Sequence, residues 1–365
     1  MSKKQFNNTV VIAAAGSRKT TYVVEEAIKR TQQKILVLTY TINNLNQIRR
    51  YFIEQAGVVP SNVTVQSWYQ FLLQDCSRPY QPVLYDKERI ETICFVEGRS
   101  CPYVPKTNVQ RYYFAEGKRI YTDKISDFAC RCNEESGGLV VKRLEQIYHC
   151  IFIDEVQDLA GYDFDFLELL FESRMEIVVV GDSRQATYFT NCSPKNKKYK
   201  GQNITALLTD WQKRGLCKIT ERNDCYRCNQ EICNVADGLY PDMPKTQSKN
   251  RDVTGHDGVY VLSSCDLMEY VKRYRPTILR YNRKTKAEGL RALNFGISKG
   301  QSFERILIFP NGVIKDFLKT KNHDKLKDKT KALLYVAITR ARYSVAFVYD
   351  DECCLNEIQK VCLET

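Results

Sequence analysis

A short apolar run ends in adjacent carboxylates in the segment Ile151-Phe152-Ile153-Asp154-Glu155-Val156-Gln157-Asp158. An uninterrupted apolar run of this kind is typical of a strand buried on both faces of a parallel sheet, so Asp154 and Glu155 are expected at its carboxyl end. One carboxylate there can hold Mg²⁺, and its neighbour can orient a water for phosphoryl transfer. A solvated acidic turn is the alternative explanation for an Asp-Glu pair on its own. The rest of the chain decides between the two.

Length and composition set the outer limits. The chain has 365 residues, which suits two domains with separate cores. Lys and Arg (55) exceed Asp and Glu (43), and the resulting net charge of +12 fits an anionic partner but is weak evidence by itself. No apolar run reaches the length of a membrane span, and Met1–Lys4 leads into polar residues without a signal-peptide core. We therefore expect a cytoplasmic protein with no membrane partner.

The cysteine count raises the question of disulfides and zinc. Fifteen cysteines in a chain without a secretion signal are expected to be reduced. Two clusters invite a zinc interpretation, namely Cys130 with Cys132, and Cys225 and Cys228 with Cys233. Neither cluster supplies four ligands at the spacing of a zinc finger, and the three histidines are scattered. Structural zinc is therefore not expected.

A second motif lies near the N-terminus. Residues 9–15 form an apolar run, which is followed by Gly16-Ser17-Arg18-Lys19-Thr20-Thr21 and then by a helical pattern. This order of strand, loop and helix is the context of a phosphate-binding loop, in which backbone N–H groups at the helix start surround phosphate oxygens. Lys19 would reach the terminal phosphates, and Thr20 would ligate Mg²⁺. Arg18 stands where the pattern G-x-x-x-x-G-K-[ST] has glycine, so it points outward, adds a phosphate contact or weakens the site.

Two further segments combine strand-like runs with hydroxyl and amide side chains. Residues 35–43 end in Thr41, Ile42 and Asn43, and residues 64–69 contain Ser67 and Trp68. As isolated segments they are ordinary strand termini whose hydroxyls cap the helices that follow.

Residues 75–148 are less regular, and they predict a small insert in the first domain. Segments 111–114 and 118–121 interleave cations with aromatic rings, as surfaces that bind single strands do. The commoner explanation for such a pattern is an amphipathic element whose tyrosines are half-buried.

The remaining motifs lie in the second half of the chain. Residues 176–185 form a buried strand that ends in G-D-x-x-Q, which can place the Gln185 amide near a γ-phosphate. Residues 221–228 precede a helical pattern, and residues 334–342 contain V-A-I-T-R-A before another strand. An arginine presented by a second domain can neutralise charge on a phosphoryl group in transfer when the domains close.

Six of these segments, in order from Ala13 to Arg342, resemble the motif boxes of UvrD/Rep-like superfamily 1 helicases. The resemblance implies an α/β fold of two RecA-like P-loop domains with parallel sheets, which bind ATP in the cleft between them. Residues 1–210 would form the first, ATP-binding domain with the small insert, and residues 211–365 would form the second, helicase C-terminal domain. The interval from Arg280 to Lys299 is short, so the second domain has no large insert.

The resemblance also implies roles for individual residues. Glu155 would polarise the attacking water, Gln185 would sense the γ-phosphate, and Tyr226 would stack on adenine. The catalytic residues would be Lys19, Asp154, Glu155, Gln185, Arg227 and Arg340. The ATP contacts would be Ala15, Gly16, Ser17, Arg18, Lys19, Thr20, Thr21, Tyr226, Arg227 and Arg340, with Mg²⁺ held by Thr20 and Asp154. The nucleic-acid contacts would be Thr41, Asn43, Ser67, Trp68, Tyr188 and Lys299.

The implied function is an ATP-dependent translocase or helicase that moves 3′ to 5′ on single-stranded DNA. The alternative is a nucleotide-gated nucleic-acid sensor, or a scaffold subunit for a partner nuclease, with weak or no unwinding. Partner proteins from replication, repair or defence would fit either function. An RNA motor stays open, because no residue visibly reads a 2′-hydroxyl. Thr190 departs from the family pattern, since it stands where a second base-stacking aromatic is expected.

Overall fold

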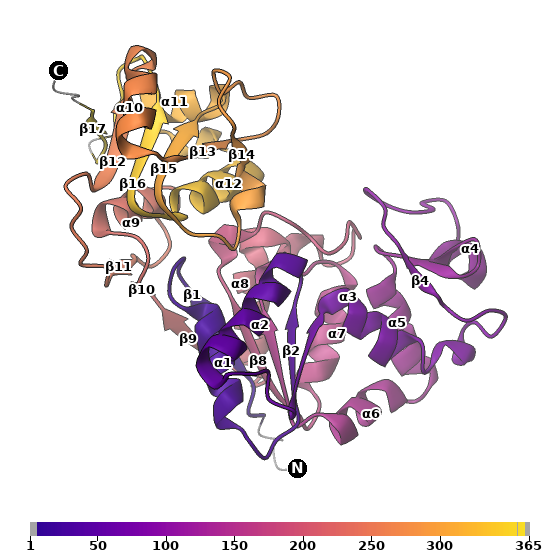
Figure 1. Ribbon diagram of the computed structural model, residues 1–365. Coiled ribbons are helices and arrows are strands. Elements are labelled where there is room, and N and C mark those ends of the chain that lie inside the picture. Colours follow the sequence, from indigo (N-terminus) through magenta and orange to yellow (C-terminus); the bar gives the residue numbers. More distant parts are fainter. Residues whose placement is uncertain (1–5, 356, 362–365) are drawn as a thin grey trace. The chain divides into compact units, whose positions relative to one another are not determined.

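The computed structural model describes residues 6–355 and 357–361, and its contacts divide the chain into two compact units (Figure 1). The first unit comprises the described residues up to 12 together with 19–183 and 188–221. The second comprises 13–18, 184–187 and the described residues from 222 onward. The segment Met1–Lys4 lies outside the described residues. Within the described part, no helix combines the length and apolar character needed to cross a bilayer.

A six-stranded sheet forms the centre of the first unit, with strand order β3-β2-β7-β8-β1-β9. Its strands are β1 (Thr9–Ala13), β2 (Ile35–Thr39), β3 (Val63–Ser67), β7 (Cys150–Asp154), β8 (Glu176–Gly181) and β9 (Lys218–Arg222). The pairs from β3 through β1 are parallel. Every residue of β2 and β7 is buried, which explains why both read as continuous apolar runs. The expected strand that ends at Asp154 is thus β7.

Helices pack beside this sheet in Figure 1, and aromatic side chains fill much of the space between them. The helices are α1 (Lys19–Lys29), α2 (Ile42–Ala56), α3 (Trp68–Phe71), α7 (Tyr162–Phe171) and α8 (Ile204–Lys213). Trp211 of α8 is fully buried, its ring meets Phe171 edge to face at 5.0 Å, and its Nε1 donates to Glu168 Oε2 at 3.1 Å. Helix α8 therefore belongs to the core of the first unit.

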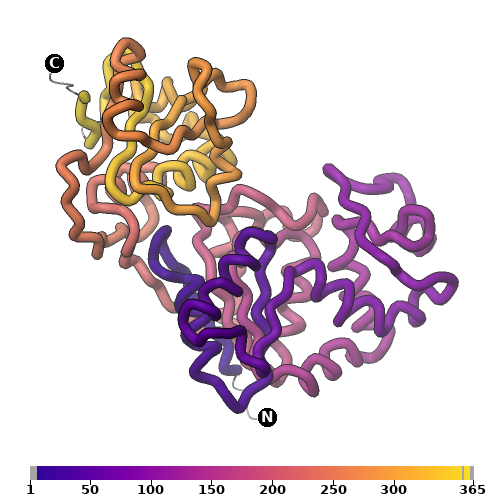
Figure 2. The backbone as a smooth tube through the Cα atoms, in the orientation of Figure 1, coloured from indigo at the N-terminus to yellow at the C-terminus, as the bar shows by residue number. Residues whose placement is uncertain are grey.

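The insert leaves the sheet after α3 and returns to it at β7, as the chain trace in Figure 2 shows. Its elements are β4 (Thr92–Cys94), α4 (Val109–Tyr113), β5 (Phe114–Ala115), β6 (Arg119–Tyr121), α5 (Ile125–Glu135) and α6 (Leu139–Ile147). The strands form a small sheet in the order β4-β6-β5. Tyr113 and Phe114 are buried, and the Tyr113 hydroxyl donates to Asp127 Oδ2 at 3.1 Å. These two rings form the insert's core and are not available to a single strand.

The second unit is built on another six-stranded sheet, in the order β14-β13-β15-β16-β12-β17. Its strands are β12 (Gly258–Leu262), β13 (Thr277–Arg280), β14 (Leu293–Asn294), β15 (Phe303–Phe309), β16 (Ala341–Val348) and β17 (Gln359–Lys360), all paired in parallel. Its helices are α9 (Gln230–Asp237), α10 (Leu267–Tyr274), α11 (Gly312–Thr320) and α12 (Asp328–Ile338). A two-stranded ladder of β10 (Asp224–Cys225) and β11 (Gln247–Ser248) accompanies them.

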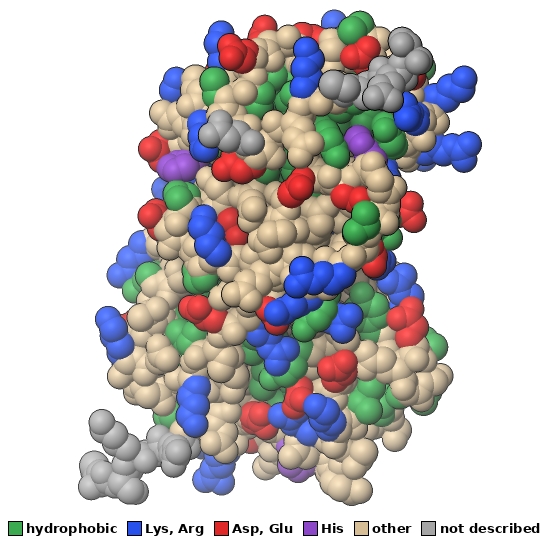
Figure 3. Space-filling view, turned by 90° about the vertical axis from the view of Figure 1, so that its left-hand side faces the viewer, with side chains coloured by type: hydrophobic (Ala, Val, Ile, Leu, Met, Phe, Trp, Pro, Cys, Tyr) green, Lys and Arg blue, Asp and Glu red, His purple; other side chains and the backbone are tan. Residues whose placement is uncertain are grey.

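The two parallel sheets, each with its own helices and core, confirm the predicted α/β fold of two RecA-like units. Only β14 and a 3-10 turn (Phe295–Ser298) separate β13 from β15, so the second unit has no large insert at this position. On the face shown in Figure 3, lysine and arginine side chains are interspersed with acidic ones, so the net positive charge does not mark that face as one basic patch.

Candidate functional site

The carboxyl end of β7 and the start of α1 bring together two of the predicted metal ligands. Thr20 Oγ1 donates to Asp154 Oδ2 at 2.9 Å, and the Glu155 N–H donates to Asp154 Oδ1 at 2.9 Å. Asp154 is buried, being only 2% exposed. Burial, followed by the charge of Glu155, raises the pKa of Asp154 to about 7, while Thr20 and Lys19 act in the opposite direction.

This pair fits a magnesium ion. A hydroxyl oxygen and a carboxylate oxygen are hard ligands of the kind that Mg²⁺ prefers. A buried carboxylate with a raised pKa also lacks sufficient positive charge around it, which a divalent cation would supply.

The residue after Asp154 is held in an uncommon backbone conformation. Glu155 has φ 62°, in the left-handed region, which costs a residue with a Cβ about 1–2 kcal/mol. Its carboxylate accepts a hydrogen bond from Gln157 Nε2, and Gln157 Oε1 accepts from the Asp182 N–H at 3.0 Å. A Cβ at Gly181 would lie 2.8 Å from Val156 Cγ1, so this glycine permits the close approach of β8 to the acidic box.

The loop in which phosphate binding is expected is tightly packed and contains a buried hydroxyl group. Gly16 has φ 73°, and a Cβ there would lie 2.7 Å from Cys225 Sγ and 2.9 Å from Arg227 Cβ. Both the backbone conformation and the packing therefore require glycine. The Ser17 hydroxyl is buried and has no hydrogen-bond partner among the described residues. An orphaned buried hydroxyl is costly, and a phosphate oxygen would satisfy it.

Arg18 takes a position that the sequence did not predict. It has φ 60°, which explains why the family pattern has glycine here, since glycine alone adopts this conformation without strain. Its guanidinium lies over the Tyr226 ring, 4.1 Å from the centroid, and both residues belong to the second unit. The Tyr226 N–H also donates to Gly16 O at 2.9 Å. Arg18 thus covers the ring that was expected to stack on adenine.

The second unit also brings together three expected residues, namely Gln185, Arg340 and Lys299. Arg340 Nη2 donates to Gln185 Oε1 at 3.0 Å, and Lys299 Nζ donates to Gln185 O at 3.0 Å. All three side chains are buried. Lys299, which was expected to contact nucleic acid, is 5% exposed, and its ammonium group holds the Gln185 backbone carbonyl. Gln185, the expected γ-phosphate sensor, and Arg340, the arginine expected to neutralise charge on the phosphoryl group, are therefore in direct contact.

Sequence reasoning missed Arg184, which precedes the predicted sensor. Arg184 Nη1 pairs with Asp237 Oδ1 at 3.2 Å, both side chains are buried, and the guanidinium lies 5.0 Å from the centroid of the Tyr335 ring. Tyr335 is three residues before Ile338, where α12 ends and the V-A-I-T-R-A box continues. The available signal was an arginine at the end of a strand expected to be buried, since an arginine that enters a core is almost always paired.

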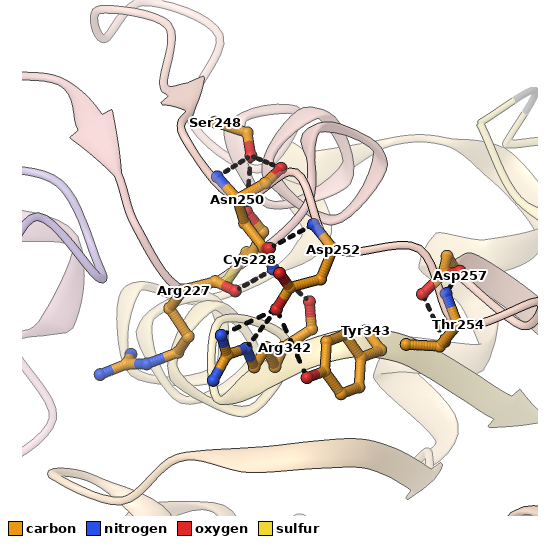
Figure 4. A network of polar contacts seen from close by, with 9 residues as sticks. All are labelled: Arg227, Cys228, Ser248, Asn250, Asp252, Thr254, Asp257, Arg342 and Tyr343. Atoms are coloured by element: carbon orange, nitrogen blue, oxygen red, sulfur yellow. Dashed lines mark hydrogen bonds and ion pairs between the residues drawn. The ribbon is translucent and has the colours of Figure 1, made fainter.

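A network of polar contacts holds the backbone of the Tyr226–Arg227 segment (Figure 4). Asn250 Nδ2 donates to Arg227 O at 2.8 Å and to Arg342 O at 3.3 Å. Asp252 Oδ2 accepts from Arg342 Nη2 at 2.8 Å. Figure 4 shows that the Arg227 guanidinium points away from this network, and its Nη1 donates to Thr339 O at 3.0 Å. Nothing in the linear pattern of the polar loop at 241–257 indicated this role.

Three cysteine thiols lie side by side next to the Tyr226–Arg227 segment. Cys225, Cys228 and Cys233 are buried, and the Cys228 N–H donates to Cys225 Sγ at 3.3 Å. Hydrogen bonds from the other two thiols lower the pKa of Cys225. Among the residues that the structure describes, no group of three or more His, Cys, Asp or Glu side chains is arranged to hold a metal ion.

The residues expected to contact nucleic acid from the first unit have different environments. Thr41 Oγ1 accepts from the Asn44 N–H and Ser67 Oγ from the Gln70 N–H, each at 3.2 Å, so both hydroxyls cap helices as the alternative explanation held. Asn43 is exposed, and Tyr188 is 40% exposed.

Trp68, which was expected to contact nucleic acid, and Thr190 both lie in the core. The Trp68 ring is 1% exposed, and its Nε1 donates to Asp163 Oδ1 at 2.7 Å. The buried Asp163 carboxylate also accepts from the hydroxyls of Thr190 and Ser126, and from the Ala160 N–H at 3.1 Å. Thr190 therefore replaces the expected aromatic with a hydrogen-bond donor to a buried charge. The residues bonded to Asp163 are called the Asp163 hub below. The sequence alone did not reveal this hub, because its members lie in four separate segments of the chain.

Comparisons with known proteins agree with part of this picture. Residues 107–202 match the family described as UvrD/REP helicase N-terminal domain. No curated protein sequence matches the chain.

Solved helicase structures resemble the whole chain at low identity. The arterivirus nonstructural protein 10 helicase is 14% identical, with 94% of this chain and 59% of that chain covered and a TM-score of 0.46. The PRRSV helicase is 16% identical, with 97% and 54% covered and a TM-score of 0.47. The arterivirus helicase in complex with DNA is 15% identical, with 94% and 60% covered and a TM-score of 0.47. This chain thus spans less than two thirds of the length of each of these proteins.

Proposed function

We propose that this chain, which is similar to UvrD/Rep-like superfamily 1 helicases, is an ATP-driven translocase on single-stranded nucleic acid. The family match over residues 107–202 confirms the resemblance that the sequence motifs predicted. The observation that carries the proposal is the pairing of Thr20 with the buried Asp154, directly beside Glu155 in its left-handed conformation. A hydroxyl, a buried carboxylate and a second carboxylate at one strand end are the parts that nucleotide hydrolysis requires.

ATP and Mg²⁺ are the cofactors in this proposal. Bound Mg²⁺ would neutralise charge on the phosphates, with Thr20 and Asp154 as its protein ligands. Lys19, the Ser17 hydroxyl and the backbone N–H groups of 15–21 would hold phosphate oxygens. Glu155 would orient the attacking water, and its fixed backbone conformation supports that role because a strained residue is held in one position.

Gln185 and Arg340 would act as one unit in nucleotide sensing. The hydrogen bond between Arg340 Nη2 and Gln185 Oε1 holds both side chains in place. Arg340 would exchange this acceptor for a phosphate oxygen, whereas Gln185 would contact phosphate through its amide N–H groups. Arg227 would act beside them, with Asn250 fixing its backbone. Tyr226 would stack on adenine once Arg18 leaves its ring.

The two units correspond, in this proposal, to the two RecA-like domains of a helicase. The first domain would then extend to about residue 221, beyond the expected end at residue 210, since Trp211 packs in the core of the first unit. The polarity is 3′ to 5′ and the strand is DNA, by resemblance to the UvrD/Rep family.

One observation favours a second candidate, a nucleotide-gated sensor or scaffold subunit for a partner nuclease. Arg18 lies over Tyr226 and would compete with adenine for that ring, which would weaken nucleotide binding and slow hydrolysis.

ATP hydrolysis with and without oligo(dT) or oligo(U) separates the two candidates. A motor should hydrolyse ATP many times faster with one of the two strands, and streptavidin displacement from end-labelled oligonucleotides should report its polarity. Hydrolysis that neither strand accelerates would reject the motor in favour of the sensor.

A further inference from the structure

A row of aromatic rings runs from the sheet of the first unit to the insert. The rings of Tyr40 and Tyr69 meet edge to face with centroids 5.6 Å apart, and those of Tyr69 and Phe95 do so at 6.0 Å. Tyr40 follows β2, Tyr69 lies in α3, and Phe95 follows β4 of the insert. These three residues are called the aromatic row below. Edge-to-face geometry at these distances is favourable beyond the area that it buries.

The row is firmly held at its inner end. The Tyr69 hydroxyl donates to Thr190 O, and the Tyr40 hydroxyl donates to Phe189 O at 3.4 Å. Burial raises the pKa of Tyr69 well above its usual value, so this hydroxyl keeps its proton and its hydrogen bond. The two tyrosines are thus fixed both by their rings and by their hydroxyls.

The outer end of the row is different, because Phe95 is 74% exposed. A phenylalanine has no polar group to place in water, and this one contributes little to the core. Tyr69 fixes one side of the ring, while most of its surface faces solvent. A fixed, exposed aromatic ring is the feature on which an unpaired base stacks.

The charged and polar residues near the inner end of the row, at Tyr40, favour a nucleic-acid strand over an apolar protein segment. Lys200 Nζ lies 4.1 Å from the centroid of the Phe189 ring, beside the carbonyl that receives the Tyr40 hydroxyl. Lys197 and Lys198 are exposed in the same loop, and Asn43 is exposed three residues after Tyr40. Cations that accompany aromatic rings are typical of grooves that follow a charged backbone and stack its bases.

We propose that Phe95 is a base-stacking residue for single-stranded nucleic acid, presented by the insert at the end of the aromatic row. This inference rests on the proposed function. It gives the insert a part in holding the strand, and it supplies a stacking ring in a chain whose residue 190 is a buried threonine.

The test measures the Kd of fluorescein-labelled oligo(dT) and oligo(U) by anisotropy for the wild type, Phe95→Ala, Phe95→Leu and Phe95→Trp. Loss of one stacked base should raise the Kd about 5- to 150-fold in the Ala variant. The Leu variant keeps apolar bulk without a ring and should be similarly weak, whereas the Trp variant should bind within about threefold of the wild type. Tyr103→Ala is the matched control, because Tyr103 is a 97% exposed aromatic of the same insert outside the row.

Two further readouts separate stacking from other effects. Phe95→Ala removes no cation, so the slope of log Kd against log salt concentration should not change. A strand with 2-aminopurine at one position should show fluorescence quenching with the wild type that is lost with Phe95→Ala. The unfolding midpoint should hardly change, because the ring is mostly exposed.

The outcomes are distinguishable. If the wild type binds a strand and Phe95→Ala binds it equally well, Phe95 is not a stacking residue, although the proposed function stands. If the wild type binds neither strand, the proposed function falls, and this inference falls with it. A loss shared equally by Tyr103→Ala would show a general effect of the insert and would also overturn the assignment.

Discussion

Metal binding at Asp154 should depend on pH in the neutral range. The pKa of Asp154 is raised to about 7, chiefly by burial, and the metal must displace the proton. About nine tenths of this carboxyl would be ionised at pH 8 and about one tenth at pH 6, so the apparent affinity for a divalent cation should fall about tenfold over that range. Mn²⁺, measured by the loss of its free paramagnetic signal, is a suitable probe without nucleotide.

Two variants sharpen this prediction. Asp154→Asn removes the titrating group, so residual Mn²⁺ binding should be weak and independent of pH between 6 and 8. Thr20→Ala removes a hydrogen bond that lowers the pKa of Asp154, so the midpoint should move to higher pH. Asp351→Asn is the control, since Asp351 is an exposed aspartate of the second unit. Wild-type binding that stays constant from pH 6 to 8 would refute the account of a buried, cation-deficient carboxylate.

The same group should affect stability with a defined sign. Because its folded pKa is raised above the unfolded value, the proton favours the folded state, and this contribution is lost as pH rises through about 7. Without metal, the free energy of unfolding should therefore fall between pH 5 and 8 in the wild type relative to Asp154→Asn. Added Mn²⁺ should restore part of it at pH 8.

Three further variants test the proposed machinery. Glu155→Gln should keep ATP binding but lose turnover, because an amide cannot activate water as a carboxylate does; near-normal hydrolysis would remove Glu155 from that role. Arg340→Ala should cut hydrolysis by about 10³ or more while ATP affinity stays within a few-fold, and equal losses in both would make Arg340 a structural residue. Arg18→Gly relieves a left-handed conformation that costs about 1–2 kcal/mol and uncovers the Tyr226 ring, so ATP should bind more tightly and turn over faster. A marked drop in turnover would instead assign a phosphate contact to Arg18.

The sequence predicted those parts of the fold that depend on local pattern. Strand β7 was predictable because an apolar run without alternation has to be buried on both faces. The helix caps at Thr41 and Ser67 followed from the same kind of local chemistry, as the simpler explanation of those residues held.

Contacts between distant segments were not predictable. Trp68 and Asp163 are far apart in the chain, and only the fold shows that the indole N–H is used in the core. The contact of Arg18 with Tyr226 and the support of Arg227 by Asn250 are also long-range. A residue type indicates what a side chain can do, but its partner is determined by packing.

The Asp163 hub has a consequence for how this chain can evolve. Its carboxylate depends on donors from α3, from the insert and from the loop that contains Thr190 and Asn191. Introducing an aromatic at position 190 by a single mutation would remove one donor and force a large ring into a site that is 3% exposed. Substitutions at these positions should therefore be strongly epistatic, and a second stacking ring is more accessible to descendants of this protein at an exposed position than at residue 190.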